Sequence, residues 1–198
     1  MQTAGRTALH TRGWVLRCGR HDARRARRSG PSAGFATGGL KALARGLDFA
    51  KLAAAAELLG VIRGVTARAL HHLRTREQFG VAIGTFQALR HRAVDLHLQQ
   101  ELVSAALDDA CAAADAGAPD LPMRAARVKA RASSAALLAA KEATQMHGAM
   151  GYTDECEVGL FLKRALALSA WLGNASELRA LHARACLHPQ SLPVAATA

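Results

Sequence analysis

Apolar residues recur every three or four positions through most of the sequence, which is the spacing of one face of an α-helix. This spacing predicts four long helices, at residues 47–73, 85–116, about 121–146 and about 154–172. A shorter fifth helix is predicted at residues 175–186, because Gly173 and Asn174 interrupt the pattern before it. No stretch of the sequence shows the alternation of apolar and polar residues that predicts a strand.

The apolar positions of the first three helices line up into stripes that predict their buried faces. The first stripe consists of Leu52, Ala55, Leu59, Ile62, Ala69 and Leu73, with Thr66 as its polar member. The second consists of Phe86, Leu89, Ala93, Leu96, Val103 and Leu107, with Gln100 on the same line. The third consists of Val128, Ala132, Ala135, Ala139, Glu142 and Met146.

The connectors between the predicted helices are short. Asp120 is expected to cap the third helix, with Pro122 in its first turn, where a missing N–H does no harm. Thr153 is expected to cap the fourth helix, with two acidic residues in the first turn, where the helix dipole favours them. Long helices with short connectors pack antiparallel, so the sequence predicts an all-α fold: an antiparallel four-helix bundle with an extra C-terminal helix.

The composition supports helices over strands, because 51% of the residues are hydrophobic and most of these are Ala and Leu. The formal net charge is +11. Residues 1–39 contain eight Arg and one Asp, so they supply +7 of this charge and leave +4 for the other residues. The basic excess belongs to one end of the chain, and we do not predict nucleic acid as a partner of the helical part.

Three regions follow from these patterns. Residues 1–39 are predicted to be a disordered Arg-rich leader, because like charges repel and little apolar surface offsets the ordering entropy. Residues 40–187 form the predicted bundle, and residues 188–198, with Pro189 and Pro193, form a loose tail.

The cysteines Cys18, Cys111, Cys156 and Cys186 are widely separated and form no Cys-x-x-Cys or Cys/His zinc pattern. We interpret them as free thiols in a reducing compartment, which predicts a cytoplasmic location. No apolar run is long enough to cross a membrane, and the Arg-rich start lacks the apolar segment of a signal peptide. The sequence therefore predicts no membrane association.

The histidines do not form a convincing metal site. His71 and His72 are adjacent and face different directions on a helix, while His91 and His97 are six residues apart, which is not ligand spacing on one helix face. His147 lies in a Gly-containing stretch and is expected to be part of a turn.

Residues 76–87 form a polar, Gly-containing turn between the first two predicted helices. Arg76, Phe79 and Gln87 offer a guanidinium fork, an aromatic face and an amide. Such a set suits a phosphate-bearing aromatic ligand, because Arg pairs with phosphate oxygens and Phe stacks on a ring. A plain polar turn between two helices is the alternative interpretation.

The sequence Arg-Glu-Gln-Phe-Gly at residues 76–80, followed by Phe86-Gln87, resembles the signature of the acyl-CoA dehydrogenase family at the turn between the first two helices of its C-terminal domain. Residues 145–152 resemble a second family pattern, Gln-x-x-Gly-Gly-x-Gly-Tyr or Phe, with Ala149 in place of the second Gly. Residues 55–60 are typical of one bacterial branch. The resemblance covers about residues 46–184, which is only the C-terminal helical-bundle domain of a usual member.

The resemblance implies an oxidoreductase of fatty acid metabolism, a flavoprotein that uses FAD to dehydrogenate an acyl-CoA thioester. It also implies a homo- or hetero-oligomer with acyl-CoA dehydrogenase-like subunits, because in the family the two turns serve the FAD of a neighbouring subunit. Carried over by position, Arg76 meets the FAD pyrophosphate, Phe79 lies against the adenine side and Gln87 hydrogen-bonds the dinucleotide. Gln145 and Gly148 come close to the pyrophosphate, where the absence of a Cβ permits close approach. Simple turn packing is the alternative role for Phe79 and Gly148.

The family's catalytic base is a Glu, and both family positions lack it here. The usual position is just before a Gly after the fourth helix, and the junction here, Trp-Leu-Gly-Asn-Ala at residues 171–175, contains no acidic residue. A minority position on the first helix is occupied by Ala50. Asp48 and Glu57 are poorly placed to replace the Glu, and Glu177 is expected to be a solvated or capping residue. We therefore assign no catalytic residue. Because abstraction of a proton α to a thioester needs a well-placed carboxylate, we expect little or no catalysis by this chain alone.

A non-catalytic helical assembly subunit, or a truncated remnant of such an enzyme, is the alternative function. Retention of Arg76, Gln87 and Gln145 favours the flavin site, and the missing Glu favours the alternative. The basic leader has three interpretations: an organellar transit-like leader, an arm for nucleic acid or anionic surfaces, or translation across a misplaced start or an out-of-frame junction. The third fits best, since an intact family member has a helical domain and a β domain upstream.

Overall fold

The computed structural model describes residues 34–187, with side chains from residue 38 onward. All of these residues belong to one unit of the chain, Ser32–Ala198. The disorder predicted for residues 1–39 therefore falls mostly outside the described residues, and the loose tail predicted for residues 188–198 falls wholly outside them.

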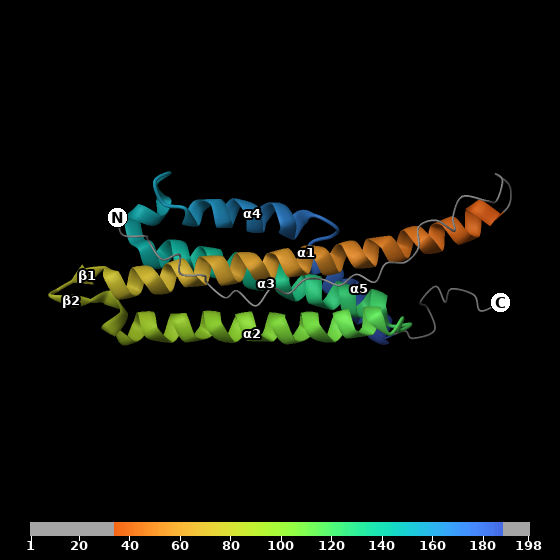
Figure 1. The fold of residues 1–198 in the computed structure, drawn as a ribbon, viewed down its shortest axis with the longest axis horizontal. Coiled ribbons are helices and arrows are strands. Elements are labelled where there is room, and N and C mark those ends of the chain that lie inside the picture. The colour runs from red at the N-terminus through yellow and green to blue at the C-terminus, as the bar shows by residue number, and fades with distance from the viewer. Residues whose placement is uncertain (1–33, 188–198) are drawn as a thin grey trace, which may run out of the picture. The chain divides into compact units, whose positions relative to one another are not determined.

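Helices make up nearly all of the described residues. The elements are, in order, α1 (Gly34–Thr75), β1 (Glu77–Gln78), β2 (Val81–Ala82), the 3₁₀ helix η2 (Ile83–Thr85), α2 (Gln87–Asp115), α3 (Leu121–His147), the 3₁₀ helix η3 (Gly148–Tyr152), α4 (Val158–Ala170) and α5 (Ala175–Leu187). Successive helices from α1 to α4 run in opposite directions, and α5 lies against α3 (Figure 1). This arrangement confirms the predicted all-α fold, an antiparallel four-helix bundle with an extra C-terminal helix.

Helix α1 begins much earlier than predicted, at Gly34 instead of residue 47. Residues 38–47 are all exposed, so this part of α1 has no buried stripe that a periodicity argument could detect. Gly38 and Gly46 lie within it; glycine weakens a helix without ending it, and no proline stops the helix here.

The side-chain cap predicted for α3 is wrong. Asp120 occupies the capping position, but its carboxylate accepts a hydrogen bond from Nε of Arg124 at 2.7 Å and none from the helix backbone. A nearby guanidinium competes with the backbone N–H groups for the same oxygens. Pro122 lies in the first turn of α3, as predicted.

The predicted start of α4 is also wrong. The Thr153 hydroxyl donates to the Met150 carbonyl at 2.8 Å and so does not cap the helix, which begins only at Val158. Residues 154 and 155 therefore lie before α4 and not in its first turn. At α5, by contrast, the Asn174 side chain accepts the Glu177 N–H at 2.9 Å and the Glu177 carboxylate accepts the Asn174 N–H at 3.0 Å, which is a reciprocal capping box.

Helix α3 is the central helix, because it packs against α1, α2, α4 and α5. Of its 27 residues 15 are buried, and nine of these are Ala, so four helices approach it closely without bulky side chains between the backbones. The predicted stripe of α1 is buried throughout, including Thr66. In the predicted stripe of α2, Leu96, Val103 and Leu107 are buried, whereas Phe86 is 37% exposed.

No helix between residues 34 and 187 combines the length and the apolar character needed to span a bilayer.

Candidate functional site

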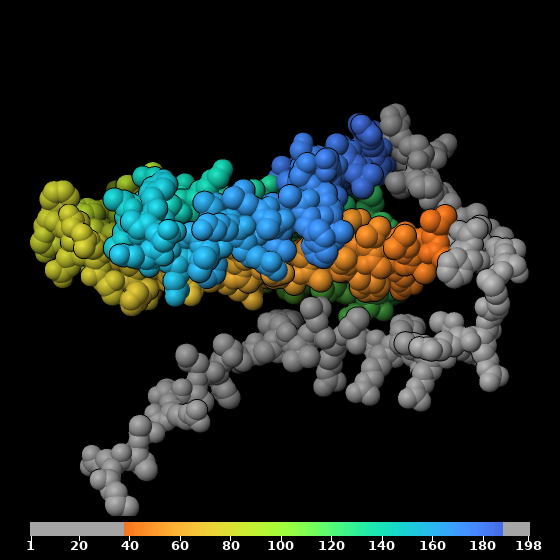
Figure 2. Space-filling model, turned by 90° about the horizontal axis from the view of Figure 1, so that it is seen from above, coloured from red at the N-terminus to blue at the C-terminus, as the bar shows by residue number. Residues whose placement is uncertain are grey.

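The two Gly-containing turns lie at the same end of the bundle. The β1–β2 hairpin follows α1, and η3 follows α3; the ribbon and the space-filling view both place these two segments beside each other (Figures 1 and 2). The imidazole rings of His72 on α1 and His147 on α3 stack there, with their centroids 4.3 Å apart. The Nδ1–H of His147 donates to the Ala143 carbonyl at 2.7 Å, which fixes the orientation of this ring.

The hairpin presents an aromatic side chain to solvent. Glu77 pairs with Ala82 and Gln78 with Val81, which leaves Phe79 and Gly80 at the tip. Both tip residues have positive φ, 55° and 78°, the backbone conformation of a tight two-residue hairpin. Phe79 is 93% exposed, and its ring meets that of Phe86 edge-on at 6.2 Å.

Two further glycines hold these turns against the helices. A Cβ at Gly84 would lie 2.7 Å from the carbonyl oxygen of Leu73, at the end of α1. A Cβ at Gly151 would overlap the carbonyl oxygen of Thr144 on α3. Both positions therefore need glycine for close packing of backbone on backbone.

All five residues predicted to contact a cofactor belong to this end, and all are exposed. Arg76 follows the last residue of α1, Gln87 begins α2, Gln145 lies in the last turn of α3, and Gly148 follows α3 with φ of 63° and no atom near its missing Cβ. The side chains of Arg76, Gln87 and Gln145 make no hydrogen bond or ion pair with any residue that the structure describes. They are free to contact a ligand or another chain.

The segment that contains the β1–β2 hairpin carries positive charge. Residues 74–90 contain three arginines and a single acidic residue, Glu77. Burial lowers the pKa of His72 below its ordinary value of 6.5, and the nearby groups His147, Arg76 and His71 lower it further. The arrangement suits an anionic ligand with an aromatic part, because unpaired guanidinium groups bind phosphate oxygens and exposed Phe offers a stacking face.

The carboxylates considered as substitutes for a catalytic base are engaged elsewhere. Asp48 is buried and pairs with Lys51 at 2.9 Å. Glu57 on α1 pairs with Arg164 on α4, and Glu177 caps α5. None of these three carboxylates is unpaired.

A buried lysine that the sequence interpretation missed contacts the junction between α4 and α5. Lys129 is fully buried on α3, and its Nζ donates to Ser133 Oγ at 3.0 Å and to the carbonyls of Ser169 and Gly173, each at 3.4 Å. Burial lowers the pKa of Lys129. It supports the backbone beside Leu172, which has φ of 60°. The sequence feature that could have indicated this burial is the position of Lys129 next to Val128, in an Ala-rich stretch of the third helix.

No group of three or more His, Cys, Asp or Glu side chains is placed to hold a metal ion within residues 34–187. Cys111, Cys156 and Cys186 are free thiols, and Cys18 lies outside the described residues.

The fold defines an all-α bundle domain with two Gly-containing turns at one end. Residues 37–187 match the family model described as "Acyl-CoA dehydrogenase, C-terminal domain". The chain therefore belongs to the acyl-CoA dehydrogenase family, and what matches is the C-terminal domain, as the two turn motifs predicted.

Curated relatives agree with this assignment. The chain is 32% identical over 157 residues to "Probable acyl-CoA dehydrogenase FadE25" of Mycobacterium tuberculosis, covering 79% of this chain and 39% of that protein. It is 36% identical over 118 residues to "Acyl-CoA dehydrogenase IpdE2" of the same organism, covering 60% of this chain and 35% of that protein. The chain thus spans less than half the length of these relatives.

Solved structures give the same fold. Butyryl-CoA dehydrogenase from Megasphaera elsdenii superimposes with a TM-score of 0.69 at 27% identity, over 71% of this chain and 37% of that chain. A steroid acyl-CoA dehydrogenase variant, Tcur3481-Tcur3483 G363A, superimposes with a TM-score of 0.70 at 29% identity, over 74% of this chain and 40% of that chain.

Proposed function

We propose that this chain serves as the C-terminal domain of an FAD-dependent acyl-CoA dehydrogenase-like flavoprotein and forms half of an FAD site at an interface between subunits. The observation that supports this most is the grouping of all five predicted contact residues, all exposed, at one end of the bundle, with the side chains of Arg76, Gln87 and Gln145 unpaired. A neighbouring acyl-CoA dehydrogenase-like subunit, identical or different, completes the site. An acyl-CoA thioester is the corresponding substrate class.

The residues present fit the cofactor. Arg76 offers an unpaired guanidinium for the pyrophosphate, and Phe79 offers an exposed ring for the adenine side. Gln87 and Gln145 offer free amides, and Gly148 offers a backbone that nothing covers. The chemistry that bound FAD would supply is acceptance of a hydride from the substrate. The contribution of these residues is to bind and orient the dinucleotide.

We further propose that this chain has little or no dehydrogenase activity without a partner. The junction at residues 171–175 contains no acidic residue, and Ala50 stands where a minority of the family carries the Glu. Asp48 and Glu57 are paired, and Glu177 caps α5. No described carboxylate is both unpaired and suitably buried to act as a base.

The first experiment is a visible absorption spectrum of the purified full chain, incubated with FAD and then desalted. Retained flavin supports the proposal, and Arg76→Gln should then lose most of it. Lys163→Gln removes one exposed positive charge on α4, away from the two turns, and should retain FAD like the wild type. Equal retention by the wild type and Arg76→Gln would contradict the role of Arg76, and no retention by either would contradict a site formed by this chain alone or by copies of it.

The alternative function is a non-catalytic helical assembly subunit, and the two empty base positions favour it. A reconstitution experiment distinguishes the two functions. Mixing the chain with an acyl-CoA dehydrogenase-like subunit and measuring mass by light scattering detects assembly, and measuring acyl-CoA-dependent dye reduction detects activity. Assembly without FAD retention supports the alternative. The cytoplasmic location and the absence of membrane and nucleic acid partners stay predictions.

A further inference from the structure

A groove lies between α2, α3 and α5, at the end of the bundle away from the β1–β2 hairpin. It consists of two adjoining hollows of about 560 Å³ and about 170 Å³. Arg127 on α3 and His182 on α5 line both hollows. No residue predicted to contact FAD lines either of them.

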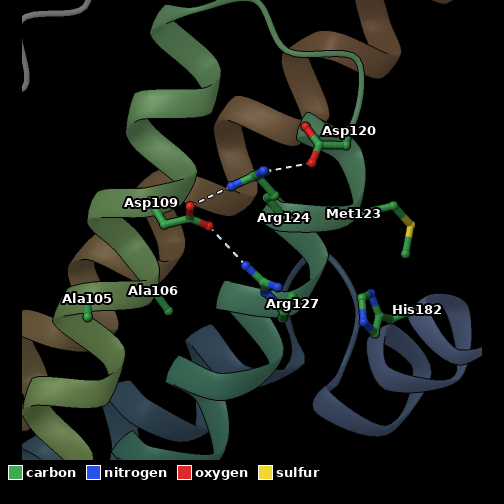
Figure 3. A pocket seen from close by; sticks show the side chains of 8 residues that line it. All are labelled: Ala105, Ala106, Asp109, Asp120, Met123, Arg124, Arg127 and His182. Carbon is green, nitrogen blue, oxygen red and sulfur yellow. Dashed lines mark hydrogen bonds and ion pairs between the residues drawn. The ribbon is translucent and has the colours of Figure 1, made fainter. Parts of the chain in front are cut away.

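The larger hollow carries its own charge compensation. Asp109 on α2 accepts hydrogen bonds from Arg124 at 2.5 Å and from Arg127 at 2.9 Å, and Asp120 accepts one from Arg124 at 2.7 Å (Figure 3). Hydrogen bonds to Asp120 and to Asp109 raise the pKa of Arg124. Arg127 thus shares its one carboxylate partner with a second arginine.

Among the residues that line the smaller hollow, only Arg127 has a carboxylate partner, Asp109. The lining of this hollow consists of Arg127, Ala130, Arg131, Leu178, Arg179 and His182, and it includes no carboxylate. Arg131 donates to the neutral amide oxygen of Gln99 at 3.2 Å, and Arg179 donates to the Ser134 hydroxyl at 2.6 Å. Three guanidinium groups therefore line one small space, and their mutual repulsion favours binding of an anion there.

Two buried nitrogen atoms in this lining lack hydrogen-bond partners among the described residues. They are Nε of Arg131 and Nδ1 of His182. The other ring nitrogen of His182 lies 3.7 Å from Sγ of Cys186, and the other hydrogen bond of Arg131 goes to Gln99. Buried polar atoms without partners are rare in folded proteins, and two of the three described here belong to residues of this basic hollow.

We propose that the smaller hollow binds a phosphate-type oxyanion. Arg127 and Arg131 from α3 and Arg179 from α5 supply positive charge and guanidinium N–H donors to its oxygens. Several acceptor oxygens on one group match these guanidinium forks, which a neutral ligand does not. The volume of about 170 Å³ suits inorganic phosphate or the terminal phosphate of a larger molecule that extends into the adjoining hollow.

The test is isothermal titration of the purified full chain, in a buffer free of phosphate, with inorganic phosphate and with pyrophosphate at constant ionic strength. We expect saturable binding with one ion per chain. Arg131→Gln and Arg179→Gln should each weaken it about tenfold or more, because each removes a charge-assisted contact. Tighter binding of pyrophosphate than of phosphate would show that the ligand extends into the larger hollow, and equal binding would restrict it to a single phosphate group.

Two control variants separate this site from other basic surfaces. Lys163→Gln removes an exposed charge on α4, and Lys141→Gln removes an exposed charge on α3 outside the groove; both should bind phosphate like the wild type. Circular dichroism checks that each variant is folded, and Arg131→Lys, which keeps the charge but has no Nε–H donor in that position, replaces Arg131→Gln if the latter unfolds. Absence of saturable binding, or loss in Lys141→Gln with no effect of Arg131→Gln and Arg179→Gln, would overturn the proposal.

Discussion

Replacement of Gly84 by Ala tests whether the first turn is held against α1 by backbone packing. The added Cβ would lie 2.7 Å from the Leu73 carbonyl oxygen, whereas ordinary contact begins at 3.4 Å. The turn must therefore move by about 0.7 Å, and overpacking of this kind costs about 1–3 kcal/mol. For a domain of this size, we expect the melting temperature to fall by about 2–12 °C.

Gly60→Ala is the matched control. Gly60 lies in the interior of α1, and no atom lies within 4 Å of its missing Cβ. Alanine there should stabilise the helix by about 0.5–1 kcal/mol and raise the melting temperature by about 1–4 °C. The same chemical change is thus expected to act in opposite directions at the two positions.

The assay is thermal unfolding followed by circular dichroism, together with the FAD retention measurement. Because η2 connects the hairpin to α2, a shift at Gly84 displaces Arg76 relative to Gln87, so Gly84→Ala should also retain less FAD than Gly60→Ala. A Gly84→Ala variant as stable as the wild type would refute the packing argument. Unchanged FAD retention in a destabilised Gly84→Ala variant would refute the link from this packing to the site.

The remaining predictions concern the core, a pH-sensitive contact and a surface ion pair. Ile62 is fully buried, so Ile62→Ala should lose about 2–5 kcal/mol in urea unfolding, and a loss below 1 kcal/mol would contradict its place in the core. The pKa of His72 is lowered by burial and by His147, Arg76 and His71, so just below pH 6.5 the unfolded chain binds more protons than the folded chain. The free energy of unfolding should therefore fall as the pH drops through that window. Urea titrations at several pH values measure this dependence, and His72→Phe should flatten it. Glu57→Gln breaks an exposed pair with Arg164, so it should change stability by less than about 1 kcal/mol; a larger loss would show that this pair is a main contact between α1 and α4.

Much of the fold could be predicted because it depends on local pattern. The stripe on α1 that includes Leu52, Ile62 and Leu73 is buried as its spacing indicates, and Pro122 marks the first turn of α3. Ordered motifs also identified the family, since the residues around Arg76 and Gln145 stand at characteristic places between the helices. These features need no knowledge of which residues meet across the bundle.

The remaining features depend on contacts between distant residues. Asp120 pairs with a guanidinium and not with the backbone, the stack of His72 on His147 joins two helices, and Lys129 reaches carbonyls far along the chain. A helical pattern gives the face on which each residue lies but not its partner. The groove around Arg131 and His182 was missed for the same reason, because its charges come from α3 and α5.

The exposed beginning of α1 gives the longest helix an uneven local stability. Residues 38–47 have no buried side chain, whereas residues 58, 62 and 65 are fully buried. A short helical segment without tertiary packing is marginal in water, so its amide protons should exchange through local fraying, long before those around Ile62 exchange through global unfolding. Among residues 38–187, a limiting amount of protease should accordingly cut within residues 38–47 first and leave the packed part of the bundle intact.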